Sequence, residues 1–387
     1  MNGRLITFTN LFPSSEFPTH GLFVRERMRR VAARTGMDWV VVCPVPSVPR
    51  ILRRGDYARW ASMPSREQVD GVEVWHPRYP HWPGLSTTRQ AARMAEAAGP
   101  VIRQLVDGRD DVLIDAHYVY PDGVAALRIG AELGVPVLVT ARGTDLNVLA
   151  RRPAVARQIR AAAPTAAGLL AVSEPLRRLM VEVGGVPDGQ VQLVRNGVDL
   201  ERFSPGDVSA ARAALGLPAD ARLVLGVGRL VTTKGFHRAL KALDGLPDAH
   251  LVLVGDGPER AALERAAPVG RLHVLGSLAP ERVAMAYQAC DVLVLPTERE
   301  GWPNVVTEAL ASGLPVVASA VGAVPEMLAS EKAGAAVAVG DDEALLRELR
   351  RVLDTPPARG ELHAYAGQFS WDGPVEQLTS LIKEVIG

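Results

Sequence analysis

The feature that most constrains the fold of this 387-residue chain is a regular alternation of short apolar runs with longer helix-like stretches. The apolar runs are rich in valine, leucine and isoleucine, which is typical of buried strands. In the first half of the chain they fall at residues 5–9, 39–43, 72–75, 112–114, 137–140, 169–172 and 191–194. Helix-like stretches lie between them at 21–34, 88–106, 123–133 and 175–183. This alternation predicts an α/β fold with a mostly parallel sheet covered on both faces.

The alternation is interrupted between residues 196 and 220, where the turn-forming pairs Asn196-Gly197 and Pro205-Gly206 occur. A second series follows, with strands expected at 223–227, 251–254, 272–275, 292–295 and 316–318 and helices at 236–243, 259–266, 282–289, 305–312 and 344–353. A chain of this length is also too long for one ordinary core. We therefore predict two Rossmann-like, doubly wound domains, residues 1–204 and 205–368. Because ligands bind beyond the carboxyl ends of such strands, we expect the domains to face a central ligand-binding cleft.

Composition narrows the classes of protein that fit. The 43 basic and 43 acidic residues give a net charge near zero, which argues against bulk nucleic-acid binding. Cys43 and Cys290 lie far apart in apolar runs, so we expect buried packing residues and neither a disulfide nor a zinc site. The chain has no run of about 18 apolar residues, and its first apolar run is too short for a signal peptide. We therefore expect a cytoplasmic location.

The most informative stretch is residues 300–308, Glu-Gly-Trp-Pro-Asn-Val-Val-Thr-Glu, directly after an apolar strand candidate. Pro303 suits the first turn of a helix, and the free amides of a helix start attract phosphate oxygens. Glu300 on the loop and Glu308 inside the helix can then accept hydrogen bonds from sugar and ribose hydroxyls. A solvated loop acid and an ordinary helix glutamate fit this spacing equally well.

A second stretch, residues 226–235, follows the first strand of the second series and ends in Thr-Thr-Lys-Gly. Arg229 and Lys234 can neutralise a diphosphate leaving group as its charge develops. Lys234 is one of only four lysines among the 43 basic residues, so it departs from the chain's strong use of arginine. The glycine spacing fits neither a P-loop nor a dinucleotide-binding fingerprint. An ordinary surface turn remains the alternative.

Two stretches of the first half lie where a parallel sheet places ligand contacts. His117 follows the strand expected at 112–114, where its ring can hydrogen-bond a sugar hydroxyl or a developing charge. A packing histidine beside Tyr118 and Tyr120 is the alternative. Gly21 closes the loop after the first strand and opens a helix, where it permits a phosphate to approach the backbone. Any turn between a strand and a helix can also carry such a glycine.

Together these four stretches resemble glycosyltransferase family 4, and the resemblance extends over nearly the whole chain. The matching residues are Glu300 and Glu308 of its E-x7-E signature, Arg229 and Lys234 of its diphosphate-binding pair, Gly21 of its phosphate loop and His117 as its active-site histidine. Further similar segments are Ala-Val-Ser at 171–173, Arg-Asn-Gly-Val-Asp at 195–199, Gly-Asp-Gly-Pro at 255–258 and Ala-Ser at 318–319.

The resemblance implies a GT-B fold and a hexosyltransferase that retains the configuration of the anomeric carbon. It implies no metal and no cofactor beyond the nucleotide-sugar co-substrate, for which UDP-sugars are common in the family. By analogy Glu300 and Gly301 contact the donor sugar, Glu308 the ribose and Asn304 the phosphate. The final helix of the family crosses back to the first domain, which residues 369–387 can do. The most similar relatives synthesise cell-surface polysaccharides or glycolipids.

Two departures from the family pattern concern the acceptor side. Many members have a glycine pair in the first loop, whereas here His20 precedes a single Gly21. Many also have a histidine at the position of Arg142, in the stretch Thr-Ala-Arg-Gly-Thr-Asp at 140–145. Arg142 and Asp145 either line the acceptor end of the pocket or pair with each other. The acceptor, which is a glycan, a glycolipid or a small molecule, is not identified.

Two other functions fit the same architecture. A UDP-sugar epimerase also binds a diphosphate, and it differs from a transferase in releasing nucleotide without an acceptor. A non-catalytic partner subunit has no need of donor-binding residues, yet all of those named above are present. The presence of these donor-binding residues therefore favours a glycosyltransferase over the other two functions.

A further hypothesis is peripheral contact with the inner face of a membrane. On the helix expected at 21–34, Val24, Met28 and Val31 form an apolar stripe, and Arg27, Arg30 and Arg34 share a different face. Residues 49–60 mix arginines with large apolar side chains, as interfacial segments do. A solvated helix face and a covered loop are the alternative.

Overall fold

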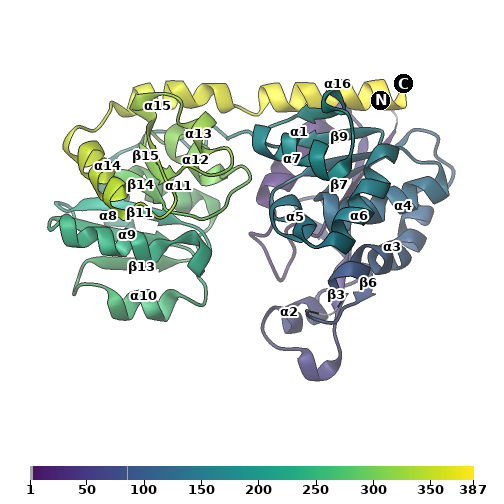
Figure 1. Cartoon of the computed structure of the whole chain (residues 1–387), viewed down its shortest axis with the longest axis horizontal. Coiled ribbons are helices and arrows are strands. Elements are labelled where there is room, and N and C mark those ends of the chain that lie inside the picture. Colours follow the sequence, from purple (N-terminus) through teal and green to yellow (C-terminus); the bar gives the residue numbers. More distant parts are fainter. Residues whose placement is uncertain (1–2, 85) are drawn as a thin grey trace. The chain divides into compact units, whose positions relative to one another are not determined.

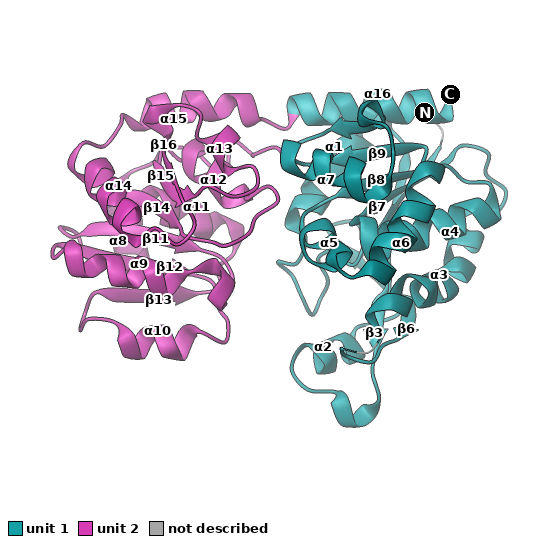
Figure 2. Ribbon diagram, in the orientation of Figure 1, with its two compact units in different colours: residues 1–196, 372–387 teal, residues 197–371 magenta. Residues whose placement is uncertain are grey.

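The computed structural model describes residues 3–84 and 86–387. The chain forms two compact units, of which unit 1 comprises Met1–Asn196 with Asp372–Gly387 and unit 2 comprises Gly197–Trp371 (Figure 2). The division falls inside the turn pair Asn196-Gly197, whereas the predicted boundary followed residue 204. The final helix α16 (Asp372–Ile386) is part of unit 1, where it packs against α1 (Leu22–Thr35), and Arg34 Nη2 lies 2.7 Å from Glu376 Oε2.

Unit 1 is built on an eight-stranded sheet with the order β10-β9-β8-β7-β1-β2-β5-β4, in which only the edge strand β4 is antiparallel to its neighbour. The strands are β1 (Arg4–Phe8), β2 (Asp38–Val42), β4 (Arg66–Val69), β5 (Val72–Trp75), β7 (Val112–His117), β8 (Val137–Ala141), β9 (Gly168–Ala171) and β10 (Val191–Leu193). Two further strands, β3 (Val45–Ser47) and β6 (Arg78–Pro80), form a separate parallel pair. Besides α1 and α16, the helices are α2 (Asp56–Ser62), α3 (Gln90–Val106), α4 (Val124–Leu133), α5 (Thr144–Asn147), α6 (Pro153–Ala162) and α7 (Glu174–Gly184).

Unit 2 is built on a six-stranded parallel sheet with the order β13-β12-β11-β14-β15-β16. The strands are β11 (Arg222–Val227), β12 (Ala249–Val254), β13 (Leu272–Gly276), β14 (Val292–Leu295), β15 (Val316–Ser319) and β16 (Gly334–Val337). The helices are α8 (Val208–Leu215), α9 (Phe236–Ala242), α10 (Arg260–Ala266), α11 (Pro280–Ala289), α12 (Asn304–Ala311), α13 (Val324–Met327), α14 (Asp342–Asp354) and α15 (Arg359–Ala366). This order is the doubly wound arrangement that the alternation predicted, so the predicted fold class is confirmed.

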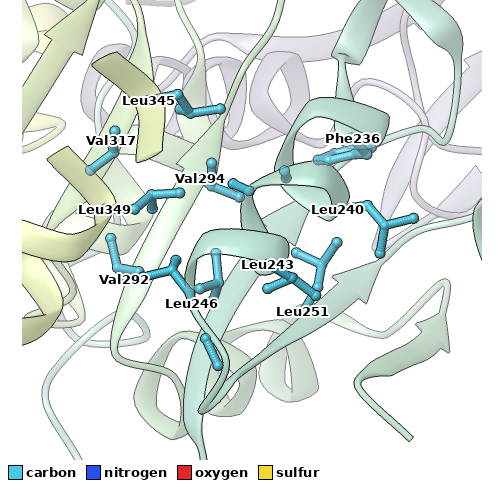
Figure 3. Packing of buried hydrophobic residues seen from close by; sticks show 14 of the residues in the cluster. Phe236, Leu240, Leu243, Leu246, Leu251, Val292, Val294, Val317, Leu345 and Leu349 are labelled. Atoms are coloured by element: carbon cyan, nitrogen blue, oxygen red, sulfur yellow. The ribbon is translucent and has the colours of Figure 1, made fainter. Parts of the chain in front are cut away.

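The core of unit 2 forms where α9 and α14 pack against the central strands. Figure 3 shows the side chains that meet there, among them Phe236 and Leu240 of α9, Leu345 and Leu349 of α14, and Leu251, Val292, Val294 and Val317 of the strands. The strand residues occur in continuous apolar runs because a central parallel strand is buried on both faces. Cys290 is buried in unit 2 and Cys43 in unit 1, as the sequence indicated, and both thiols are free.

Each sheet has one point where the order of the strands reverses. In unit 1 the reversal lies between β1 and β7, which are hydrogen-bonded neighbours, and in unit 2 between β11 and β14. At such a point the loops from the two carboxyl ends run to opposite sides of the sheet, which leaves room for a ligand. The loops after β1, β7, β11 and β14 carry most of the residues that the sequence singled out.

The structure alters one part of the membrane hypothesis, the arginine face of α1. The apolar stripe of α1 is buried as expected, but Arg27 is wholly buried too, and its Nη2 donates to the carbonyl oxygens of Val194 and Arg195. Arg34 of the same face pairs with Glu376 on α16. Helical periodicity identified the apolar face correctly, but it did not show that Arg27 is buried against the segment that follows β10.

Two pairs of loops in unit 2 approach so closely at the carboxyl edge that only glycine fits. A Cβ atom on Gly235, whose φ is +70°, would lie 2.0 Å from the carbonyl oxygen of Pro296. A Cβ atom on Gly255, whose φ is +132°, would lie 2.0 Å from the carbonyl oxygen of Gly228. Both values are far below van der Waals contact, so these glycines set the spacing of the loops that leave β11, β12 and β14.

We predict that Gly235→Ala lowers the free energy of unfolding more than Gly216→Ala. Gly216 ends α8 at a similar φ of +66° but has open space where a Cβ would lie, so it reports the backbone strain alone, about 1–2 kcal/mol. The clash with Pro296 should add about 1–3 kcal/mol, as overpacking does. Thermal or denaturant unfolding measures the difference, and equal losses in the two variants would contradict the close approach.

Candidate active site

Two motifs that lie far apart in the sequence meet at the carboxyl edge of unit 2. Lys234 ends a short 3-10 helix, Thr232–Lys234, after β11, and Glu300 lies in the loop after β14. The Nζ atom of Lys234 donates to Oε1 of Glu300 at 2.6 Å. Backbone contacts join the same loops, since Glu298 N donates to the carbonyl oxygen of Thr233 at 3.0 Å. The structure thus places a cation and a carboxylate at the reversal point of the sheet.

The loop that carries Arg229 is fixed through its backbone while the side chain is exposed. Leu230 N donates to the carbonyl oxygen of Asp256 at 2.9 Å, and Glu259 N donates to that of Leu230 at 3.0 Å. These bonds tie the loop after β11 to the Gly-Asp-Gly-Pro segment that follows β12. Arg229 is therefore an accessible cation on an ordered loop.

The loop of Glu300 and Gly301 rests on the segment after β15. Ala323 N donates to the carbonyl oxygen of Gly301 at 3.2 Å, and Gly322 packs so closely on Glu300 that a Cβ would lie 2.3 Å from its carbonyl oxygen. The Glu300 side chain is only 12% exposed. Its carboxylate is consequently held in place before any ligand arrives.

Helix α12 begins at Asn304, and Pro303 is the residue immediately before it. The expectation that Pro303 lies inside the first turn is therefore wrong by one position. Glu308 lies within the helix, as predicted, and its Oε2 accepts a hydrogen bond from the buried Tyr287 hydroxyl at 2.8 Å. Burial raises the pKa of Glu308 to about 6, while the hydrogen bond from Tyr287 and the charge of Arg202 lower it.

Sequence reasoning missed Tyr287, because it lies in the last turn of α11 with no motif around it. Its role depends on the packing of α11 against α12, which brings the hydroxyl to a carboxylate 21 positions away. The position of a tyrosine in a helix does not show which distant acceptor it meets.

In unit 1, Gly21 lies where the first loop turns into α1. Its φ is +67°, and a Cβ atom would lie 2.2 Å from the carbonyl oxygen of Leu11. Close packing is therefore enough to explain why this position is glycine. Nε2 of the preceding His20 lies 3.1 Å from the carbonyl oxygen of Asn10. That a phosphate approaches Gly21 stays a prediction.

His117 ends β7 and is wholly buried, with both ring nitrogens facing other buried side chains. Nη2 of Arg142 donates to Nδ1 at 2.7 Å, and Nε2 lies 3.2 Å from Oδ2 of Asp115. Burial lowers the pKa of His117 to about 4, although Asp115 raises it, and the charge of Arg142 lowers it further. The ring is therefore neutral near pH 7, with its proton on the nitrogen that faces Asp115.

The backbone N–H of Arg142 donates to Oδ2 of Asp145 at 3.2 Å, but the Arg142 side chain has other partners. Nη1 of Arg142 donates to Oδ1 of Asn196 at 2.6 Å, and the guanidinium carbon lies 5.2 Å from the ring centroid of Phe23 on α1. The carboxylate of Asp145 accepts backbone N–H groups of Val119 and Gly143, both at 2.7 Å. Within the described residues no ion pair joins the two side chains. Asp145 therefore shapes the loop before α5, whereas Arg142 belongs to a cluster with His117 and Asn196.

We predict that His117→Asn weakens the acid sensitivity of the protein. The unfolded chain protonates His117 near pH 6.5 and the folded chain only near 4, so the unfolded state binds more protons in this window. Stability is then lost as the pH falls from about 6.5 to 4, by on the order of 3 kcal/mol. Asparagine can still accept from Arg142 but does not titrate.

Unfolding of wild type and His117→Asn, followed at several pH values, measures this effect. The same substitution at the exposed His237 on α9, outside the buried cluster, gives the matched control. An acid dependence that is the same in His117→Asn as in wild type would contradict the burial of a neutral ring.

Comparison with known proteins agrees with this description. Residues 28–202 match the family model described as Glycosyltransferase Family 4, and residues 207–369 match that of Glycosyl transferases group 1. TuaC of Bacillus subtilis, which is assigned as a glycosyltransferase of teichuronic acid biosynthesis, is 32% identical over 331 residues, 84% of this chain and 82% of the relative. D-inositol 3-phosphate glycosyltransferase of Mycolicibacterium gilvum is 35% identical over 224 residues, but these cover 54% of this chain and 50% of the relative.

Solved structures share the fold along the whole chain. Sucrose-phosphate synthase from Thermosynechococcus elongatus superposes with a TM-score of 0.78 at 21% identity, covering 100% of this chain and 99% of that one. HepE of Anabaena in complex with UDP-glucose superposes with a TM-score of 0.73 at 19% identity, covering 99% and 100%. The two doubly wound units define a glycosyltransferase of the GT-B class. Within that class the chain belongs to glycosyltransferase family 4. Among the helices of the described residues, none has the length and apolar character needed to cross a bilayer.

Proposed function

We propose that the protein is a retaining hexosyltransferase that takes its sugar from a nucleoside diphosphate donor, with UDP as the nucleotide. The observation that carries this proposal is the contact between Lys234 and Glu300 at the reversal point of unit 2, beside the exposed Arg229. The likeness to the HepE complex with UDP-glucose supports the choice of donor. The relation to TuaC supports an acceptor in the synthesis of a cell-surface polysaccharide, either a glycan or a lipid-linked sugar.

In this proposal Arg229 and Lys234 stabilise the nucleoside diphosphate leaving group. Breaking the bond between the sugar and the diphosphate leaves negative charge on the phosphate oxygens, and fixed cations that face this charge lower the barrier. An ammonium group has three N–H donors, so Lys234 can keep Glu300 as a partner and still donate to a phosphate oxygen. Arg229 adds a second positive charge from an ordered loop.

The carboxylates and the helix start recognise the neutral parts of the donor. Glu300, held by Lys234 and by the Gly301 loop, accepts hydrogen bonds from sugar hydroxyls. Glu308 has one oxygen on Tyr287 and further lone pairs with which to accept the ribose hydroxyls. The start of α12 at Asn304 offers backbone amides to a phosphate.

Unit 1 contributes differently from what the family pattern implied for His117. A neutral ring enclosed by Asp115 and Arg142 is suited to orienting Arg142, whose guanidinium lies beside the first turn of α1. We therefore assign Arg142 to the acceptor side and give His117 the task of holding it. Asp145 supports the same loop through the backbone.

We predict that Arg229→Ala and Lys234→Ala each lower kcat/KM by about 100-fold, the usual effect of losing one group that stabilises transition-state charge. Steady-state rates of nucleoside diphosphate release, measured with a panel of nucleotide sugars and acceptors, test this. Lys241→Ala on α9 and Arg265→Ala on α10 remove the same charges from exposed helix positions and should leave kcat/KM unchanged.

Rates within a few-fold of wild type in both loop variants, with normal folding, would rule out this role. The same assay separates the alternative functions. Release that does not need an acceptor would indicate an epimerase of the same architecture, and no release with any donor would indicate a non-catalytic subunit.

We also predict that activity survives an excess of chelator. The sequence has no Asp-x-Asp pair, so we assign the charge of the leaving group to Arg229, Lys234 and the start of α12. Rates with and without EDTA, each with added Mn²⁺ or Mg²⁺, measure the dependence. Complete loss in chelator that is restored by either cation would contradict this assignment.

A further inference from the structure

Residues 45–64 and 78–84 of unit 1 form a small substructure of their own, which we call the appendage. It contains the strand pair β3–β6, the short 3-10 helix Arg50–Leu52 and helix α2. Figure 1 shows α2 and its flanking loops on the far side of β3 and β6 from the main sheet of this unit. The appendage is thus a separate surface feature, which the roles assigned to the cations and carboxylates do not use.

The exposed large hydrophobic side chains of the described part of unit 1 all lie on this appendage. Ile51 is 80% exposed, Trp82 49% and Leu52 38%. His81, next to Trp82, donates its backbone N–H to Ser47 at 2.8 Å, and its ring stacks on Tyr57 with centroids 6.0 Å apart. Ser47 and Tyr57 bracket the segment of Ile51 and Leu52, so the three side chains belong to one region.

The same region is strongly basic in a chain with no net charge. Residues 45–64 hold four arginines and one acid, Asp56, which gives a net charge of +3, against 43 basic and 43 acidic residues overall. Arg50, Arg53 and Arg54 flank the apolar pair Ile51-Leu52, and residues 50–56 are all exposed. Among the residues that the structure describes, the one hydrogen bond made by these three side chains is from Arg53 Nε to the carbonyl oxygen of Val48, at 3.4 Å.

The exposed side chains project from an ordered base. Nη1 of Arg78 donates to the carbonyl oxygen of Trp60 at 2.9 Å, and the rings of Tyr57 and Trp60 meet edge to face at 5.3 Å. The aromatic residues that hold the appendage together are therefore distinct from the residues that it exposes. Ile51 and Trp82 take no part in these contacts, and exposed apolar side chains that share one surface mark an interaction site.

We propose that the appendage docks on the surface of an anionic lipid bilayer. Arginines interleaved with an isoleucine, a leucine and a tryptophan match the two parts of such a surface, since the cations attract the head groups and the apolar side chains enter the layer beneath. Tryptophan in particular favours the interface between head groups and acyl chains. This proposal for the appendage does not depend on which nucleotide sugar is the donor.

The appendage also contacts the loop that leads to Gly21. The rings of Trp60 and Phe17 lie 5.7 Å apart, and the guanidinium of Arg59 lies 4.0 Å from the Phe17 ring and 3.9 Å from the Glu16 carboxylate. Docking would therefore hold this loop near the bilayer, where a lipid-linked acceptor is delivered. This last step rests on the proposed function.

Vesicle sedimentation of the full-length protein tests the surface. Wild type should bind vesicles of phosphatidylcholine with phosphatidylglycerol, bind phosphatidylcholine alone much more weakly, and lose binding in high salt. An arginine at an anionic surface strengthens partitioning about fivefold, so the triple variant R50Q/R53Q/R54Q should bind roughly 100-fold more weakly. The variant I51S/L52S should lose binding without a change in charge.

The matched control is R103Q/R128Q/R157Q, which removes three exposed arginines from α3, α4 and α6 of the same unit. It should bind like wild type, and circular dichroism should show that every variant is folded. Weak binding that does not differ between wild type, the arginine variant and the control would overturn the proposal. Nucleoside diphosphate release without vesicles should be unchanged in all variants, so failure of the donor assignment would appear in that assay and not in sedimentation.

Discussion

The ion pair between Lys234 and Glu300 joins two loops that leave neighbouring strands where the strand order of unit 2 reverses. Its formation depends on how closely the loop backbones approach, which glycine at 235 and 322 makes possible. The side chains of this pair are 27% and 12% exposed, so the cost of removing the two charges from water offsets much of their attraction. The pair is therefore better explained by the position it gives to its two charges. The spacing of the cation, the carboxylate and the start of α12 follows from this arrangement of loops.

Unit 1 buries a group of charged side chains that no simple stability argument explains. Burial raises the pKa of Asp115, but His117, Arg27 and Arg142 together lower it below its ordinary value. Removing such charges from water costs several kcal/mol for each ion, and their mutual attraction only partly offsets the cost. The group lies at the carboxyl ends of β7 and β8, where an α/β sheet places its ligand contacts, so function explains its presence better than stability does.

Most of the architecture could be predicted from the sequence, because continuous apolar runs mark central parallel strands and helical periodicity marks the layers that cover them. The strands β3, β4, β6 and β16 were not predicted, since they are short and mostly polar or half-buried. Glu300 and Glu308 were singled out because a motif holds them eight positions apart, one on a turn and one in the helix that follows. Tyr287, Asn196 and the burial of Arg27 could not be found in this way, since each depends on which distant element packs against it.

The place of α16 in unit 1 has a consequence for the order in which the protein is made. Leu378 and Ile382 of α16 are wholly buried, and the helix packs on α1, which is synthesised more than 300 residues earlier. Unit 2, Gly197–Trp371, is synthesised between the two. At about 5–20 residues per second, α1 spends on the order of ten seconds or more without its covering helix. Unit 2 can therefore reach its native fold before unit 1 does, although unit 1 begins the chain.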